Sequence, residues 1–160
     1  MFTRTLSNNA QNTLALLGAK KILPENTYLA GGSSLALQID HRISIDFDFF
    51  TSTNFFTEEI DRKLNEVGRY QKNVQTPKTM VGNFNNIKFS LFYYPYKLIS
   101  KPLDFLGIKL AQKEDIAAMK LVAITDRGTK KDFIDLYFLA KFYFPIEKMF
   151  EFYNKKYQLF

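Results

Sequence analysis

Apolar residues recur at helical spacing in several separate stretches of the chain. Residues 9–20 place Ala10, Leu14 and Leu17 on one face, which predicts a first amphipathic helix. Hydroxyl, acidic or proline residues stand where further helices are expected to begin, because they cap free N–H groups or fit the first helical turn. These further helices are predicted at residues 33–39, 57–67, 114–126, 131–142 and 145–152.

Between the predicted helices lie short stretches with the residue pattern of β-strands. Asn85 and Asn86 separate two of these stretches and predict a hairpin turn, and Pro95 ends the second one. Residues 103–110 are ambiguous, and we assign them one more short strand. The other strands are predicted at residues 27–30, 44–50, 70–76, 79–84 and 87–94.

This order of elements predicts an α/β (α+β) fold, in which helices pack on a small mixed β-sheet and the C-terminal part is helical. No linker rich in proline, glycine or serine divides the chain. We therefore expect a single domain over residues 1–160, with a sheet-containing core at about 1–110 and a helical part at about 111–160. A chain of 160 residues can bury a sizeable core.

The composition is that of an ordinary globular protein, with 46% hydrophobic and 24% charged residues. The absence of cysteine excludes disulfides, thiolate metal sites and thiol nucleophiles. No apolar run is long enough to span a bilayer, and the polar N-terminus does not resemble a signal peptide, so we expect a cytoplasmic protein without a membrane partner. The net charge of +6 fits a polyanionic partner such as nucleic acid or nucleotide phosphates, and equally fits an ordinary basic protein.

Two aspartates stand two residues apart in the strand predicted at residues 44–50. Asp46 and Asp48 therefore share one face, and Phe47 and Phe49 fall on the other face with Ile45. Neighbouring carboxylates repel each other, and a divalent cation relieves this repulsion; a pair of oxygen ligands suits Mg²⁺. The apolar neighbours indicate a largely buried strand, in which aspartates need partners. The alternative is an exposed face with two solvated aspartates.

The sequence Gly31-Gly32-Ser33-Ser34 lies between a predicted strand and a predicted helix. Glycine lets the backbone approach a phosphate, the helix N-terminus offers free N–H groups, and a serine hydroxyl adds a donor. Taken alone, such a turn is common and need not bind anything. The twelve residues between Ser33 and Asp46 are enough for a short helix and a return to the sheet, which would place the acidic strand beside this turn.

Lys120 is the only charge within the apolar residues 117–124, and Asp135 is equally isolated within residues 133–139. On a helix Lys120 shares a face with Arg127. Such a lysine either extends to solvent or meets a partner, which is an aspartate or a triphosphate. Asp135 is expected either to form a structural ion pair with Lys120 or Arg127 or to join them in one site.

Other charged residues near this region have simpler interpretations. Asp132 fits the acid of a helix start. Lys130 and Lys131 are interpreted as surface charges, with contact to RNA as the alternative. The single histidine, His41, is interpreted as a structural contact near the acidic strand rather than as a catalytic base.

These segments resemble the AbiEii/AbiGii toxin family within the DNA polymerase β-like nucleotidyltransferase superfamily. The resemblance is carried first by residues 31–37 and 41–50, which contain the glycine–serine turn and the Asp-x-Asp strand. It is carried further by Lys120, by residues 126–128 and by residues 131–137, which resemble the lysine-bearing helix of the family and its second motif block. The resemblance extends over residues 28–139.

The resemblance implies an Mg²⁺-dependent nucleotidyltransferase that uses an NTP. It implies the toxin of a toxin–antitoxin or abortive infection system, with an antitoxin partner and with tRNA or another RNA as acceptor. It assigns catalysis to Asp46, Asp48, Lys120 and Asp135, metal binding to Asp46 and Asp48, and nucleotide binding to Gly31, Gly32, Ser33, Ser34 and Arg127.

One feature departs from the pattern of the superfamily. Many of its members carry a third carboxylate on a following strand, but residues 87–92 contain no acid, and Ser90 or Lys88 stands in its place. One interpretation is that a single metal suffices for catalysis, and another is that Asp135 supplies the missing oxygen. The alternative is a catalytically degenerate module that binds nucleotide or RNA. A purely structural domain, with its aspartates in salt bridges, is a third interpretation.

Overall fold

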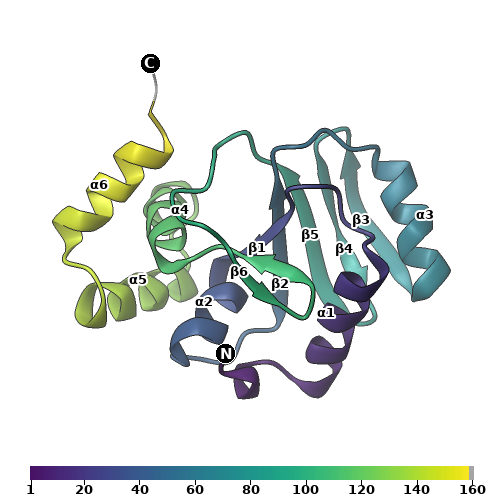
Figure 1. The fold of residues 1–160 in the computed structure, drawn as a ribbon, viewed down its shortest axis with the longest axis horizontal. Helices are drawn as coiled ribbons and strands as arrows, with labels where there is room; N and C mark the ends of the chain where they lie inside the picture. The colour runs from purple at the N-terminus through teal and green to yellow at the C-terminus, as the bar shows by residue number, and fades with distance from the viewer. Residues whose placement is uncertain (159–160) are drawn as a thin grey trace.

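The computed structural model describes residues 1–158, which fold around a seven-stranded mixed β-sheet (Figure 1). The strands lie in the order β3-β4-β5-β2-β1-β7-β6. Strand β1 is parallel to β7 and β2 is parallel to β5, whereas the other neighbours are antiparallel. The strands are β1 (Tyr28–Ala30), β2 (Asp46–Thr51), β3 (Tyr70–Thr76), β4 (Thr79–Phe84), β5 (Ile87–Tyr93), β6 (Leu103–Phe105) and β7 (Ile108–Leu110).

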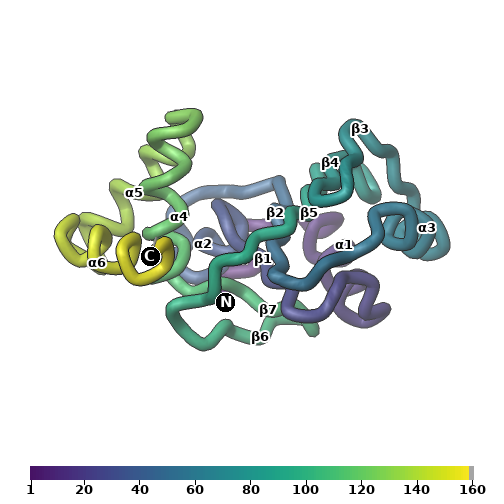
Figure 2. The backbone as a smooth tube through the Cα atoms, turned by 90° about the horizontal axis from the view of Figure 1, so that it is seen from above, coloured from purple at the N-terminus to yellow at the C-terminus, as the bar shows by residue number. Residues whose placement is uncertain are grey.

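Helices cover both faces of the sheet, which confirms the predicted mixed α/β architecture. Seen from above, α1 and α3 lie on one side of the sheet, and α2, α4, α5 and α6 lie on the other (Figure 2). The helices are the 3₁₀ helix η1 (Thr3–Thr5), α1 (Asn8–Lys20), α2 (Gly31–Ile39), α3 (Thr57–Val67), α4 (Lys113–Asp126), α5 (Lys130–Phe142) and α6 (Ile146–Lys156).

The core is divided by the sheet into two apolar clusters. The larger cluster packs Leu14 of α1 and Leu64 of α3 against Phe47, Phe49 and other residues of the sheet. The smaller cluster lies on the opposite side, where residues of α4, α5 and α6 pack against β1. Phe47 and Phe49 of β2 point toward the larger cluster. Because successive residues of a strand face opposite sides, the residues that alternate with them must face α2, α4 and α5.

Local sequence features account for several boundaries. The Ser7 hydroxyl accepts a hydrogen bond from the Ala10 amide at 3.1 Å and caps α1. Asn85 and Asn86 adopt left-handed backbone angles, with φ of 51° and 65°, as a two-residue hairpin turn between β4 and β5 requires. Both features agree with the helix and the hairpin that the sequence predicts.

Three expectations differ from the structure. Helix α2 begins at Gly31 rather than at Ser33, and Ala30 is its N-cap. Pairing in β2 begins only at Asp46, so Ile45 precedes the strand and is 55% exposed rather than buried. Residues 103–110 form a hairpin of two strands, because Leu106 and Gly107 take positive φ angles and reverse the chain between β6 and β7. The second of these strands extends the sheet by pairing with β1.

Within residues 1–158, no helix combines the length and the apolar character that crossing a bilayer demands.

Candidate active site

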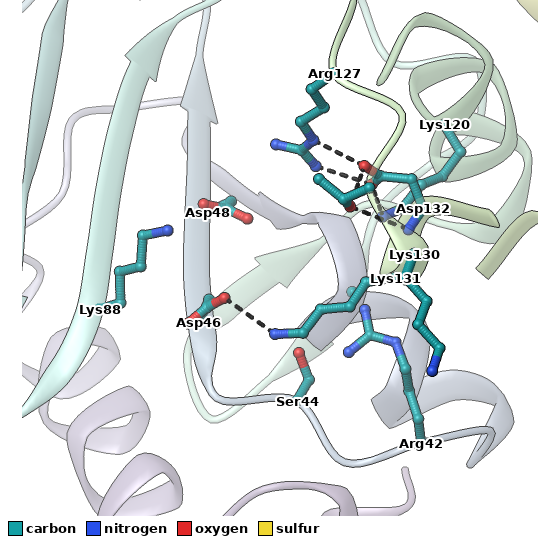
Figure 3. Close-up of a pocket in the computed structure, with 12 residues that line it drawn as sticks. Arg42, Ser44, Asp46, Asp48, Lys88, Lys120, Arg127, Lys130, Lys131 and Asp132 are labelled. Atoms are coloured by element: carbon teal, nitrogen blue, oxygen red, sulfur yellow. Dashed lines mark hydrogen bonds and ion pairs between the residues drawn. The ribbon is translucent and has the colours of Figure 1, made fainter. Parts of the chain in front are cut away.

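The two aspartates of β2 lie in the wall of a cavity of about 500 Å³ (Figure 3). Asp46 and Asp48 are partly exposed, and they alternate with Phe47 and Phe49, which are buried in the core. The acid pair therefore shares one face of the sheet, as the sequence predicts. The strand is buried only on the face of Phe47 and Phe49, so the expectation of a largely buried strand holds for that face alone.

The first turn of α2, which follows β1 directly, adjoins this acid pair. Ala30 pairs with Asp48 across the β1–β2 ladder, and Gly31 follows it with φ of 64°. A Cβ atom at Gly31 would lie 3.2 Å from Asp48 Oδ2, and one at Gly32 would lie 1.9 Å from Arg42 Nη2. The absence of side chains at both glycines thus lets an acid and a guanidinium approach the start of α2.

The two serines of this turn are buried and make contacts within the protein. Ser33 Oγ contacts the main-chain oxygen of Asp46 and lies 2.9 Å from Ser44 Oγ. Ser34 Oγ donates to the main-chain oxygen of Ala111 at 2.9 Å. Gly32 lines the cavity, whereas the serine side chains fix the turn to β2 and to the residue after β7. Their predicted role in nucleotide binding remains a prediction.

Six basic side chains line the same cavity and give it a strong positive character. They outnumber its three carboxylates, Asp46, Asp48 and Asp132, and most of them lie across the cavity from the acid pair (Figure 3). Lys131 Nζ lies 3.8 Å from Asp46 Oδ2. A cavity with this excess of cations favours a polyanion such as a triphosphate. The basic residues are Arg42, Lys88, Lys120, Arg127, Lys130 and Lys131.

Two further aspartates hold part of this cationic wall in place. Asp132 accepts two hydrogen bonds from Arg127, at 2.8 and 2.9 Å, and one from Lys120 at 2.9 Å. Asp135 accepts two from Arg42, one on each carboxylate oxygen, at 2.6 and 3.0 Å, and its Oδ2 also lies 2.6 Å from Lys120 Nζ. Lys120 therefore bridges the two carboxylates and is itself only 4% exposed.

The same network fixes the ionisation of both carboxylates. Hydrogen bonds from Arg127, together with those from Lys120 and Thr129, outweigh burial and hold the pKa of Asp132 far below its ordinary value. Burial alone would raise the pKa of Asp135, but hydrogen bonds from His41 and Arg42 and the charge of Lys120 lower it well below its ordinary value. Both aspartates are therefore charged partners of the basic wall at neutral pH.

Asp135 does not reach the cavity itself. Its side chain is fully buried, and it is absent from the residues that line the cavity. His41, also with a buried side chain, contacts Asp135 at 2.7 Å through Nε2. His41 thus meets the acid of α5 rather than the acidic strand, and the predicted catalytic role of Asp135 has to act through Lys120 or Arg42.

The acid pair is much less well neutralised than Asp132 and Asp135. Burial raises the pKa of Asp48 and the neighbouring Asp46 raises it further, while Lys88 and Arg127 oppose the shift. Among residues 1–158, Asp48 has no basic nitrogen within 4.0 Å, and the single ion pair of Asp46 is the 3.8 Å contact to Lys131. Two adjacent, poorly compensated carboxylates on a cavity wall are a donor set that fits a divalent cation, and their oxygens suit Mg²⁺.

The strand register identifies what stands in place of a third carboxylate. Ser90 lies opposite Asp48 on β5, and Lys88 lies opposite Asp46. The described part of the chain contains no cluster of three or more carboxylate or histidine ligands suited to a metal. The site therefore offers one pair of acidic ligands, flanked by a hydroxyl and an ammonium group.

A second cavity, of about 340 Å³, adjoins the first. Asp48, Lys88, Lys120 and Arg127 line both cavities, so Asp48 lies where they meet, whereas Asp46 lines the first cavity only. The second cavity is otherwise mainly apolar, which suits an aromatic ring better than a phosphate. Its apolar walls come from β2, β4, β5, the residues after β5, and α4: Phe50, Val81, Phe92, Tyr94, Ile116, Met119, Val122 and Ala123.

Several residues of the site were not assigned a role from the sequence. Lys88 was named only in the place of a third carboxylate, although it shares a face with Ser90 on a predicted strand. Arg42 and Asp132 gave weaker indications, because their partners depend on the fold: Arg42 meets Asp135, which is 93 residues away. Asp132 does begin a helix, as interpreted, but it is also the buried partner of Arg127 and Lys120.

The fold is shared with several solved structures, among them nucleotidyltransferases. The structure resembles JHP933 of Helicobacter pylori, with a TM-score of 0.62 and 22% identity over 89% of this chain and 72% of that one. It resembles MenT4, a nucleotidyltransferase toxin of Mycobacterium tuberculosis H37Rv, with a TM-score of 0.60 and 18% identity over 90% and 61% of the two chains. It also resembles the Megavirus polyadenylate synthase, with a TM-score of 0.56 and 15% identity over 84% and 32%.

The chain belongs to the family of the nucleotidyl transferase AbiEii toxin of type IV toxin–antitoxin systems, whose model matches residues 15–101 and 94–159. This confirms the resemblance found in the sequence. Protein aq_aa25 of Aquifex aeolicus (strain VF5) is 44% identical over 118 residues, which are 71% of this chain and 57% of that protein. The chain thus matches little more than half the length of this relative.

Proposed function

We propose that this protein is an Mg²⁺-dependent nucleotidyltransferase toxin that transfers a nucleoside monophosphate from an NTP to an RNA acceptor such as tRNA. The observation that carries the proposal is the contrast between two pairs of aspartates. Asp132 and Asp135 are saturated with cationic partners, whereas Asp46 and Asp48 face the cavity with almost none. An acid pair left open beside a basic wall suits a metal–triphosphate complex.

The basic wall provides the means to hold the triphosphate. Arg42 and Lys120 are fixed by Asp135, and Arg127 by Asp132, so these cations are positioned before any nucleotide arrives. Groups that are fixed in advance stabilise developing charge without a cost of reorganisation. Lys130 and Lys131, which are both exposed, complete the wall.

Asp46 and Asp48 would hold the metal. When bound, Mg²⁺ neutralises phosphate charge and polarises the phosphoryl oxygens. With the triphosphate in the basic cavity, the base of the NTP fits the adjoining apolar cavity beside Phe50 and Tyr94. The acceptor hydroxyl then forms a bond to the α-phosphorus, the bond to pyrophosphate breaks, and the hydroxyl proton passes to solvent.

The direct test is a transfer assay. The protein is incubated with total tRNA, Mg²⁺ and each of the four α-labelled NTPs, and the labelled RNA is separated and mapped. We expect transfer by the native chain and at least 100-fold less with Asp46→Ala. Asp104→Ala is the matched control, because Asp104 is an exposed aspartate on β6, paired with Lys109 outside the cavity. An Asp46→Ala variant as active as the control would refute the proposal.

The second candidate is a nucleotide- or RNA-binding module without turnover, and Ser90 opposite Asp48 favours it. The two functions separate in a paired measurement of binding and transfer. Calorimetry that shows Mg²⁺-dependent NTP binding, together with no labelled product on any RNA, supports the module. Family membership also leads us to propose a cognate antitoxin as partner and the cytoplasm, where NTPs and tRNA are found, as the place of action.

A further inference from the structure

Helix α5 carries an exposed surface of which the proposed transfer chemistry uses only the first residue, Lys130. Lys130, Phe133, Tyr137 and Lys141 are spaced three or four residues apart, which places them along one face of the helix. Phe133 is 53% exposed and Tyr137 is 55% exposed, although apolar rings of this size are usually covered. We call these four residues the α5 stripe.

The α5 stripe is basic as well as aromatic. Helix α5 contains two acids, Asp132 and Asp135, and both are buried in the ion network behind the cavity wall. Its exposed side chains therefore include lysines but no carboxylate. Lys141 Nζ lies 3.0 Å from the Tyr137 hydroxyl and 5.4 Å from the centre of the Tyr137 ring, so a cation stands beside an aromatic face.

The α5 stripe begins at the mouth of the cavity. Lys130, its first residue, lines the basic cavity with its neighbour Lys131. The Phe133 ring lies next to Gly128, in the loop that carries Arg127 and Thr129 into the cavity wall. From Lys130 the stripe runs outward along α5 for about 16 Å, at 1.5 Å per residue. That length corresponds to roughly four or five nucleotides stacked at 3.4 Å.

We propose that the α5 stripe is the docking surface for the single-stranded end of the acceptor RNA. Exposed aromatic rings stack on unpaired bases of any sequence, and lysines beside them pair with phosphates. A surface that starts at the cavity mouth would lead the terminal nucleotide toward the acid pair. A protein partner fits less well, because lysine is depleted in protein–protein interfaces and no exposed acid of α5 balances these cations. The inference rests on the proposed function for the identity of the acceptor.

The test measures RNA binding without NTP, so it does not depend on catalysis. The full chain is titrated into a fluorescein-labelled single-stranded RNA of 12 nucleotides, and anisotropy is followed at several salt concentrations. We expect Phe133→Ala and Tyr137→Ala each to weaken binding by about 5- to 100-fold. We expect Lys141→Ala to reduce the slope of log Kd against log salt by about 0.7. A duplex of the same length should bind more weakly and respond little to the aromatic changes.

The chain offers matched controls far from α5. Phe56 is 76% exposed at the start of α3, at the other end of the molecule (Figure 1), and Lys20 is exposed at the end of α1. Phe56→Ala and Lys20→Ala should bind RNA as the native chain does. If the native chain binds the RNA no better than Phe133→Ala/Tyr137→Ala, the α5 stripe is not an RNA surface, and a protein partner becomes its better occupant. Loss of transfer in Asp46→Ala with RNA binding intact separates this inference from the proposed function.

Discussion

Ser90 lies directly opposite Asp48 in the parallel pairing of β5 with β2. Both residues line the apolar cavity, Asp48 also lines the basic one, and Ser90 is 2% exposed. A carboxylate at position 90 would stand beside the acid pair as a third oxygen ligand. The chain instead has a neutral hydroxyl there, so the residue at this one position keeps the number of neighbouring acidic metal ligands at two.

Ser90→Asp should therefore strengthen metal binding. We expect the apparent Kd for Mg²⁺ to fall about 10-fold, because affinity for hard cations rises with the number of charged ligands. Without metal, the variant should be less stable than the native chain, since a third carboxylate beside Asp46 and Asp48 adds repulsion. The measurement is the rise in Tm with Mg²⁺ concentration. Ser90→Asn is the control for shape, and equal Mg²⁺ dependence in both variants would contradict the prediction.

Asp48→Asn should stabilise the protein while removing metal binding. Burial and the neighbouring Asp46 raise the pKa of Asp48 in the folded chain, so its ionised form opposes folding. The resulting loss of stability grows as pH rises toward that pKa and is complete above it. We expect the free energy of unfolding to increase by about 0.5–2 kcal/mol at pH 7 without metal, as is common when an unfavourable interaction in a functional site is removed. The gain should shrink as pH falls through the raised pKa of Asp48, where its carboxylate becomes protonated. Thermal unfolding at pH 4 and pH 7, with and without Mg²⁺, measures this.

The acid pair was accessible to sequence analysis because its geometry is local. Residues two apart on a strand share a face whatever the rest of the fold does, so Asp46 and Asp48 were placed together correctly. Helix α3 was equally local: Thr57 and the two glutamates after it mark its start, and the bounds match the prediction. The prediction that Ile45 is buried was wrong, because the alternation of apolar residues does not show where the pairing of β2 with β1 and β5 begins.

The basic wall was less accessible because its order depends on contacts far apart in the sequence. Arg42 precedes β2 and Asp135 lies in α5, and only the packing of α2 and α5 brings them together. Asp135 was correctly linked with Lys120, but its complete burial could not be read from its position in an apolar helix. The serines of the glycine turn posed the same difficulty, since their partners come from β2 and from the residue after β7.

Asp135→Asn should destabilise the protein more than any exposed charge change. Removing the charge leaves Arg42 and Lys120 without their shared partner, and breaking a buried ion pair from one side costs about 3–5 kcal/mol. The pKa of Asp135 is lowered in the folded chain, so its stabilising contribution is present above pH ~4 and is lost as pH falls. Urea unfolding should thus show a large difference from the native chain at pH 7 and a small one at pH 2. Asp104→Asn should show little difference at either pH.

Gly32→Ala should act through the Arg42 guanidinium. A Cβ atom at position 32 would lie 1.9 Å from Arg42 Nη2, which is the end of a flexible side chain and can move away. Its displacement breaks the 3.0 Å contact between Arg42 Nη2 and Asp135 and shifts a cation of the cavity wall. We expect about 10-fold weaker NTP binding and a loss of roughly 1–2 kcal/mol in stability, as when a hydrogen bond to a charged group is lost.

A double-mutant cycle distinguishes this mechanism from backbone strain. If the alanine acts through the guanidinium, Gly32→Ala should have little further effect on NTP affinity once Arg42 has been changed to alanine, because interacting sites are not additive. Gly31→Ala is the contrasting case, since its φ of 64° imposes strain of about 1–2 kcal/mol whether or not Arg42 is present. Equal effects of Gly32→Ala in the native and Arg42→Ala backgrounds would show that the glycine is needed for its backbone and not for the approach of Arg42.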